Sequence, residues 1–190
     1  MECPSFLVDK KDGKKRLIAD LRKTNLAVSP RVVALPPIHQ VLDEIQLQRP
    51  VYFSTFDLFS GYFQILLAEE SRDVTSVTAP VSGLRMRWTR APFGLAVNPS
   101  GMLTVLNQVL GRLRQNRQLT CYMDDVCSGG RTFEELPGNM RDIFQAFREN
   151  NLKCNLKKCN FGATSIDYLG FRLTSQGLKI TLTKSISCRL

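Results

Sequence analysis

The sequence predicts an α+β domain built around an antiparallel sheet. Short segments of strand type alternate with segments whose apolar residues recur at helical spacing. Turn signals at Asp12-Gly13, Ser82-Gly83 and Gln176-Gly177 join neighbouring strand segments as hairpins, and hairpins connect antiparallel strands. The chain has 190 residues, of which 43% are hydrophobic and 23% are charged, so it can form a domain of ordinary size with its own core.

The first half of the chain is expected to begin with two strands, at residues 5–9 and 15–20, joined by the Asp12-Gly13 turn. After Pro36-Pro37, the residues Ile38, Val41, Leu42 and Ile45 follow the helical period, which predicts a helix that ends before Pro50. Residues 51–57 are rich in aromatic and β-branched side chains and are predicted to form a strand. Further strands are expected at residues 62–67, 75–78 and 84–89.

The second half is expected to contain two helices and a strand pair around two adjacent acids. Asn98-Pro99 is a favourable helix start, and one apolar face follows it, made of Met102, Leu106, Val109, Leu110 and Leu113. Strands at residues 119–123 and 126–128 flank the acids. A second helix is predicted at residues 139–150, with Pro137 near its start. Residues 167–180 close the chain as a hairpin.

The charge distribution favours a polyanionic partner. The net charge is +9, and no acidic residue occurs between Asp73 and Asp124, where six arginines lie. A second basic block runs through residues 10–23. A solvated basic surface is the alternative interpretation. No apolar run is long enough for a membrane span, and the first residues lack the apolar region of a secretory signal, so we expect an intracellular protein without a membrane partner. The sequence does not distinguish cytoplasm from nucleus.

Cysteine and histidine usage argues against two classes of site. The six cysteines form no C-x-x-C pair and the chain has one histidine, so a structural zinc site is disfavoured. The single histidine also disfavours Ser-His-Asp or Cys-His catalysis. We therefore expect reduced and mostly buried thiols.

The residues that point to chemistry are three aspartates. Asp124 and Asp125 stand between two short apolar strands, and Asp57 ends another apolar strand, in FSTFDLFSGYF. Adjacent acids in a turn are often simply solvated. Here the apolar flanks imply buried strands, and a metal ion would offset the repulsion between the carboxylates. If the two strands are neighbours, the three carboxylates converge and suit a pair of Mg²⁺ ions in phosphoryl transfer.

These acids stand among sequence blocks that together resemble a known family. Over nearly its whole length the chain resembles the fingers and palm of a reverse transcriptase, most like those of Gypsy-type LTR retrotransposons. The blocks occur in the family's order: KKDGKKRLIADLRKTN, FSTFDLFSGYFQI, TRAPFGLAVNPSG, CYMDDV, NNLKCNLKKC and DYLGFRL. The resemblance implies a right-hand polymerase palm, an antiparallel sheet with helices on one face. It also implies partial fingers at residues 1–50 and a palm at residues 51–190 that includes a fingers-like segment near residues 70–95.

The resemblance also implies roles for the residues that match the family's motifs. Asp57 matches the first catalytic aspartate, and Asp124 and Asp125 match the YMDD pair. Asp57 and Asp124 would hold both metal ions, which would be Mg²⁺ or alternatively Mn²⁺, and Asp125 would be the less direct ligand. The backbone of Leu58 would join them. Lys158 matches the proposed general acid that protonates pyrophosphate, with Lys157 as a close competitor.

Further matches concern the nucleotide and the template-primer. The residues implied in dNTP binding are Lys10, Arg16, Phe59, Tyr62 and Phe93, and Tyr62 matches the aromatic position that excludes a 2′-hydroxyl. The residues implied in nucleic-acid binding are Arg22, Tyr122, Met123, Tyr168, Leu169 and Gly170, of which the last three match the primer grip.

The function that the resemblance implies is RNA-directed DNA polymerisation on an RNA or DNA template-primer. Because the sequence ends soon after the primer-grip match, we expect the thumb, RNase H and integrase of a parent polyprotein to be absent. One alternative is a truncated retroelement remnant that binds nucleic acid with weak or no turnover. Another is a two-metal nuclease on an unrelated fold, which would leave YMDD, APFG and YLG unexplained.

Overall fold

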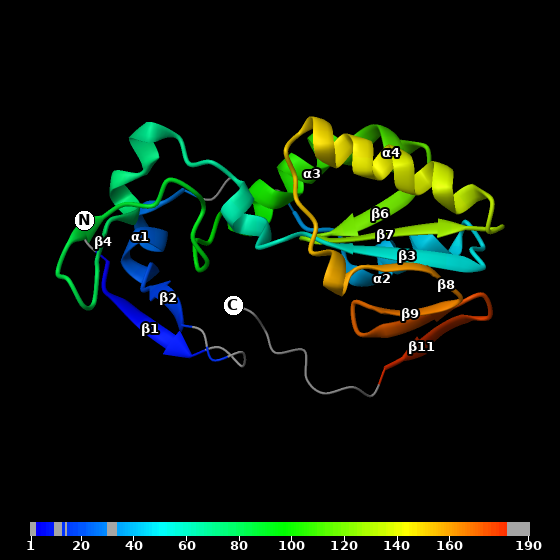
Figure 1. Cartoon of the computed structure of the whole chain (residues 1–190), viewed down its shortest axis with the longest axis horizontal. Helices are drawn as coiled ribbons and strands as arrows, with labels where there is room; N and C mark the ends of the chain where they lie inside the picture. Colours follow the sequence, from blue (N-terminus) through cyan, green and yellow to red (C-terminus); the bar gives the residue numbers. More distant parts are fainter. Residues whose placement is uncertain (1–2, 10–12, 14, 30–33, 182–190) are drawn as a thin grey trace. The chain divides into compact units, whose positions relative to one another are not determined.

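The computed structural model describes residues 3–9, 13, 15–29 and 34–181 (Figure 1). The chain divides into two compact units: residues 1–33 with 60–102, and residues 34–59 with 103–190. This division differs from the expected boundary between residues 50 and 51. Residues 34–50, expected with the fingers, belong to the second unit because their helix packs into its core. Residues 60–102 belong to the first unit, and they include the fingers-like segment that was expected near residues 70–95 within the palm.

The first unit contains two small antiparallel pairs. Strand β1 (Ser5–Asp9) pairs with β2 (Lys15–Ala19), and β4 (Val77–Thr78) pairs with β5 (Arg85–Met86). Helix α1 (Arg22–Ala27) follows β2, and three 3₁₀ turns lie at η1 (Gly61–Gln64), η2 (Glu69–Ser71) and η3 (Asp73–Thr75). A small core of buried side chains joins these elements: Cys3, Ala19, Leu21, Val77 and Leu95.

Residues 62–67 do not form the expected strand. Ser60 has a φ of 51°, and the following residues turn tightly because the N–H of Phe63 donates to the carbonyl of Ser60 at 2.8 Å. The rings of Tyr62 and Phe63 instead pack edge-on against Phe93, at centroid distances of 5.6 and 5.0 Å. The apolar pattern therefore reflects an aromatic cluster. The strands expected at residues 75–78 and 84–89 are also shorter, at two residues each.

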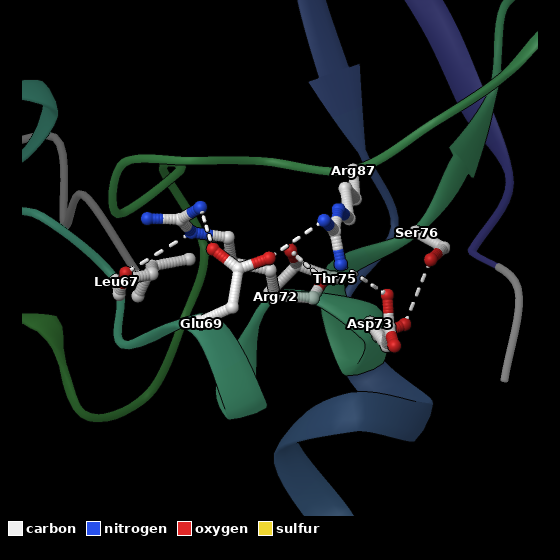
Figure 2. Close-up of polar contacts among 7 residues, drawn as sticks. All are labelled: Leu67, Glu69, Arg72, Asp73, Thr75, Ser76 and Arg87. Carbon is white, nitrogen blue, oxygen red and sulfur yellow. Dashed lines mark hydrogen bonds and ion pairs between the residues drawn. The ribbon is translucent and has the colours of Figure 1, made fainter.

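An ion-pair network holds the segment around η2 and η3 (Figure 2). Arg87 contacts Glu69 at 2.6 Å and Asp73 at 3.0 Å, and Arg72 also pairs with Glu69. The hydroxyl of Ser76 donates to the carbonyl of Asp73 at 2.8 Å. The carboxylates, that of Asp73 first, raise the pKa of Arg87. Arg87 is thus neutralised within its own unit, so part of the basic stretch of the sequence serves the fold.

The second unit is built on a four-stranded antiparallel sheet in the order β6-β7-β3-β8. Its strands are β3 (Tyr52–Asp57), β6 (Leu119–Tyr122), β7 (Asp125–Gly130) and β8 (Asn160–Ala163). A second sheet has the order β11-β10-β9, with β9 (Ser165–Tyr168), β10 (Phe171–Thr174) and β11 (Gly177–Ile180). The expected closing hairpin is therefore two successive hairpins.

Three helices and one 3₁₀ turn accompany these sheets: α2 (Ile38–Gln46), α3 (Asn98–Gln115), α4 (Glu135–Glu149) and η4 (Leu156–Lys158). Helix α3 begins in the first unit and continues in the second. Helices α2 and α3 occur where the apolar spacing predicted them. Helix α4 begins four residues earlier than expected, with Pro137 in its first turn, where the missing N–H of proline costs no helical hydrogen bond.

Helices pack against both faces of the four-stranded sheet. Phe53 clusters with Val41 and Leu42 of α2, whereas Phe56 makes edge contacts with Phe144 and Phe147 of α4. Residues 53 and 56 of one strand point to opposite faces. Figure 1 shows α4 lying over β7. The α2 face is closed by the second sheet, which adds its own buried side chains: Ile166, Tyr168 and Leu173.

Among the described residues, no helix combines the length and the apolar character that crossing a bilayer requires.

We expect Leu173→Ala to lower the free energy of unfolding by about 2–5 kcal/mol, because this side chain is fully buried and its truncation leaves a cavity. Urea denaturation followed by circular dichroism measures the loss. Leu47→Ala is the control, since Leu47 is 72% exposed, and it should change stability by less than about 0.5 kcal/mol. Equal losses in the two variants would contradict this account of the core.

Candidate active site

The strand register brings two of the three predicted acids together. In the antiparallel pair of β3 and β7, Asp57 lies directly opposite Asp125. Residues directly opposite in such a pair project from the same face of the sheet, with Cβ atoms about 4.5–5.5 Å apart. Asp124 precedes Asp125 in the turn that connects β6 to β7. The register therefore sets Asp125, rather than Asp124, across from Asp57.

The turn that carries the acids has a specific backbone geometry. Met123 has a φ of 53°, in the left-handed region that few non-glycine residues adopt. The hydroxyl of Tyr168, on β9, donates a hydrogen bond to the carbonyl of Asp125 at 3.1 Å. Burial raises the pKa of Tyr168 well above its ordinary value, so the phenol remains a donor. The second sheet thus supports the backbone of the acidic turn.

Tyr168 is only 4% exposed, so its side chain lies inside the unit. The next two residues of the predicted primer grip form the turn between β9 and β10, where Leu169 has a φ of 51° and Gly170 a φ of 83°. Gly170 is exposed. Tyr122 and Leu169 are half-buried and pack against the same core as Tyr168. The residues predicted to contact nucleic acid therefore include one interior support, Tyr168.

A loop at residues 153–159 encloses Asp57 and the two residues after it. Asn155 donates its N–H to the carbonyl of Asp57 at 2.8 Å, and Phe59 donates to the carbonyl of Lys153 at 2.8 Å. The N–H of Asp57 is directed at the sulfur of Cys159, 3.4 Å away. The backbone of Asp57 is thus held on both its N–H and its carbonyl sides. Sequence reasoning did not anticipate Asn155 or Cys159 here, because backbone contacts leave no side-chain pattern.

The same loop brings a cation to the acid. The ammonium of Lys158 lies 3.4 Å from Oδ2 of Asp57, whose side chain is 29% exposed. Lys158 is therefore the lysine of the LKK segment that reaches this carboxylate. Leu58 forms an isolated antiparallel bridge with Cys154. Burial first, then the neighbouring Cys159 and Asp57, raises the pKa of the Cys154 thiol to about 12.

The donor chemistry at this edge of the sheet suits a hard divalent cation. Carboxylate oxygens are the ligands that Mg²⁺ prefers, and Mg²⁺ takes one or two of them and completes its shell from water and phosphate. Across the described ranges, no set of three or more His, Cys, Asp and Glu side chains is arranged to hold an ion. The predicted acids at this edge are the opposed pair Asp57 and Asp125, with Asp124 beside them in the turn.

The first unit gathers three of the predicted nucleotide-binding residues. The guanidinium carbon of Arg16 lies 5.3 Å from the centroid of the Phe93 ring, and the ring of Tyr62 packs edge-on against Phe93 at 5.6 Å. Phe63 joins them and stacks on Trp88 at 5.4 Å, and neither residue was singled out by the sequence motifs. An arginine held by an aromatic ring keeps its charge and its donors for a phosphate.

Two other residues were predicted to bind the nucleotide, Lys10 and Phe59. Lys10 lies outside the described residues. Phe59 belongs to the second unit, where its side chain is 57% exposed.

Arg22, predicted to contact the template, pairs with Asp20 through two hydrogen bonds of 2.9 and 2.6 Å. Its side chain is 88% exposed. The hydrogen bond from Arg22 lowers the pKa of Asp20 to about 2. Asp20 thus orients the guanidinium without burying it.

The chain is similar to known proteins in sequence and in fold. Residues 8–173 match the family model described as reverse transcriptase (RNA-dependent DNA polymerase). The chain belongs to the reverse transcriptase family. Among its relatives, the retrovirus-related Pol polyprotein from transposon 412 of Drosophila melanogaster is 36% identical over 92% of this chain. The transposon Tf2-3 polyprotein of Schizosaccharomyces pombe is 27% identical over 92% of this chain. The chain spans only 14% and 13% of these two polyproteins.

Solved reverse transcriptases share the fold. The foamy viral protease-reverse transcriptase in complex with double-stranded DNA matches with a TM-score of 0.84 and 25% identity, over 96% of this chain and 31% of that one. The same viral enzyme in complex with an RNA/DNA hybrid matches with a TM-score of 0.82 and 24% identity, over 96% and 24%. The reverse-transcriptase-like α+β fold and the retrotransposon relationship predicted from the sequence are both confirmed.

We expect Tyr168→Phe to lower the free energy of unfolding by about 0.5–1.5 kcal/mol, because it removes the hydroxyl that donates to Asp125 and keeps the packed ring. Urea denaturation measures the change. Tyr52→Phe is the matched control, since Tyr52 lies at the far end of β3, opposite Gly130. A loss in the control as large as that in Tyr168→Phe would count against the support role.

We expect the Asp20 carboxyl to titrate near pH 2, because Arg22 stabilises its charged form. The folded-state pKa lies below the ordinary value of 3.8, so the stabilising contribution is present above about pH 4 and is lost as the pH falls through 2. Carboxyl ¹³C NMR measures the midpoint. Arg22→Gln should return it toward 3.8, and Lys23→Gln should shift it less. An unchanged midpoint in Arg22→Gln would refute the assignment.

Proposed function

We propose that this chain is the catalytic portion of an RNA-directed DNA polymerase, which transfers a dNTP to the 3′-hydroxyl of a primer. The observation that carries the proposal is the antiparallel register that sets Asp57 opposite Asp125, with Asp124 in the adjoining turn. Nucleotidyl transfer needs carboxylates fixed at one point, and strands are more rigid supports than loops. Membership of the reverse transcriptase family favours this chemistry over other uses of paired acids.

The residues that would hold divalent metal are Asp57, Asp124 and Asp125, with the Leu58 backbone beside them. Two bound Mg²⁺ ions would activate the primer hydroxyl and neutralise charge on the triphosphate. The protein's own part is to keep the carboxylates in place. The hydrogen bonds from Asn155 to Asp57, and from Tyr168 to Asp125, fix the backbone at each of the two opposed positions. Such preorganisation contributes to catalysis because the charges need not reorganise during the reaction.

Other residues would bind and orient the substrates. Arg16, carried on the Phe93 ring, would bind the phosphates of the dNTP, and Tyr62 would lie against its sugar. Lys158, which reaches Asp57 in this structure, would release that carboxylate and give a proton from its ammonium to the departing pyrophosphate. The turn at Leu169 and Gly170 would contact the primer, while Tyr168 supports it from inside.

The partner class follows from charge and from the related structures. The net charge of +9 suits a nucleic acid, whose phosphates dominate the affinity of most such complexes. The foamy viral enzyme with the same fold is described in complex with double-stranded DNA and with an RNA/DNA hybrid. We therefore propose a template-primer duplex as the partner of this chain.

The deciding experiment is primer extension on an RNA template with dNTPs and Mg²⁺, comparing the parent with Asp124→Asn. We expect the variant to lose at least roughly 10²-fold in rate, because charge stabilisation through a metal contributes several kcal/mol. Its affinity for the duplex, measured by fluorescence anisotropy, should stay within about threefold of the parent, since most of that affinity comes from basic residues.

Asp43→Asn is the matched control, an exposed aspartate on α2 whose replacement should leave extension unchanged. Full activity in Asp124→Asn would overturn the site. Shortening of the labelled strand by the parent would indicate a nuclease instead. Duplex binding without extension by the parent would overturn the polymerase proposal in favour of a nucleic-acid-binding remnant.

A further inference from the structure

The side-chain amide of Asn25 forms two hydrogen bonds with one loop of the first unit. Its Nδ2 donates to the carbonyl of Gly94 at 2.9 Å, and its Oδ1 accepts the N–H of Ala96 at 2.9 Å. Asn25 lies on α1, and the loop, residues 92–96, contains Phe93. An amide offers a donor and an acceptor together, so it pairs with backbone as another peptide group does. Asn25 thus fastens this loop to α1 at two points.

The fastened loop carries a ring of the proposed nucleotide cluster. The guanidinium of Arg16 lies over Phe93, and Tyr62 packs edge-on against the same ring. Arg16 lies on β2, and α1 follows β2 after two residues. One continuous segment therefore supplies both the arginine and the amide that holds the loop beneath it.

We propose that Asn25 is a positioning residue for dNTP binding, which keeps Phe93 in contact with Arg16 and Tyr62. The inference rests on the proposed function, because it concerns the nucleotide cluster of that site. Asn25 acts through the loop and does not touch the nucleotide. A loop that is already fixed in the binding conformation loses little freedom when the nucleotide arrives, so its preorganisation contributes to affinity.

Other contacts of the loop do not perform the same task. Asn98, only 4% exposed, donates from Nδ2 to the carbonyl of Pro92 at 2.7 Å, which closes the loop on its own chain. Leu95 is buried in the small core together with Leu21, which precedes α1. Apolar burial is non-directional, so it brings the loop to the β2–α1 segment without fixing its orientation. The two directional bonds of Asn25 run between the loop and that segment.

The test compares Asn25→Ala with Asn139→Ala in primer extension over a range of dNTP concentrations. Asn139 is the matched control, since it is also half-buried and its side chain makes two hydrogen bonds in the second unit, to the carbonyl of Gly129 and from Gln118. In Asn25→Ala, KM for dNTP should rise about tenfold, because the loosened loop must be ordered on binding. The value of kcat should stay within about twofold in both variants, since neither residue touches the reacting groups.

A second measurement reports on the cluster without any catalysis. Trp88 is the single tryptophan of the chain, and it stacks on Phe63 at 5.4 Å, which in turn packs edge-on against Phe93 at 5.0 Å. Its fluorescence therefore follows the packing of the loop. Quenching by acrylamide should increase about twofold in Asn25→Ala, because local opening exposes the indole, and it should not change in Asn139→Ala. Far-UV circular dichroism should be the same for both variants.

Each outcome separates the inference from the function on which it rests. An unchanged KM in Asn25→Ala, or an equal rise in Asn139→Ala, overturns the positioning role. A raised KM with unchanged quenching overturns the action through Phe93. A parent that never extends primer refutes the polymerase proposal, and quenching of Trp88 still decides whether Asn25 holds the loop.

Discussion

The site depends on the pairing of β3 with β7. Six residue pairs, from Tyr52 with Gly130 to Asp57 with Asp125, set the register of these two central strands. A shift of one residue would turn the side chains of one strand to the opposite face and separate the acids. The register is enforced by burial on both faces, because Phe53 packs toward α2 and Phe56 toward α4. The hydrophobic effect thus determines where the carboxylates stand.

Around the β3–β7 pair, hydrogen bonds from other segments fix the backbone atoms of the two opposed acids. Asp57 is fixed at its N–H and at its carbonyl by the loop of residues 153–159, and Asp125 is fixed at its carbonyl by Tyr168. These contacts are made to backbone atoms, and the carboxylate of Asp57 forms the ion pair with Lys158. A hydrogen bond to the backbone positions an acid without consuming the lone pairs that a metal would need.

The basic charge of the chain has more than one use. Arg87 is paired with Glu69 and Asp73 inside its own unit, and Arg114 makes two hydrogen bonds of 3.1 and 3.2 Å to Glu44. Arg16 lies on an aromatic ring, and Arg22 is oriented by Asp20 while 88% exposed. Net charge therefore indicates the class of partner, whereas the ion pairs of the fold determine which cations can reach it.

Much of the molecule could be predicted from the sequence, because the signals are local. Periodic apolar residues located α2 and α3, the apolar flanks of Asp124-Asp125 located β6 and β7, and ordered motifs identified the family. Where strand propensity depended on context, prediction was wrong. The backbone turns at Ser60, just before residues 62–67, and the rings of Tyr62 and Phe63 pack on Phe93. Aromatic side chains pack equally well in such a cluster and in a sheet.

The tertiary structure alone decided which distant segments meet. Sequence spacing left open whether Asp57 faces Asp124 or Asp125, and the β3–β7 register selected Asp125. Tertiary packing also brought Asn155 and Cys159 into hydrogen bonds with the backbone of Asp57, and the hydroxyl of Tyr168 into a hydrogen bond with the carbonyl of Asp125. The chain by itself determined the helices α2 and α3, the strands that flank the acids, and the family, because these follow from neighbouring residues. The contacts that hold the acids come from residues 43 to 102 positions away, and these residues meet only because the whole unit packs together.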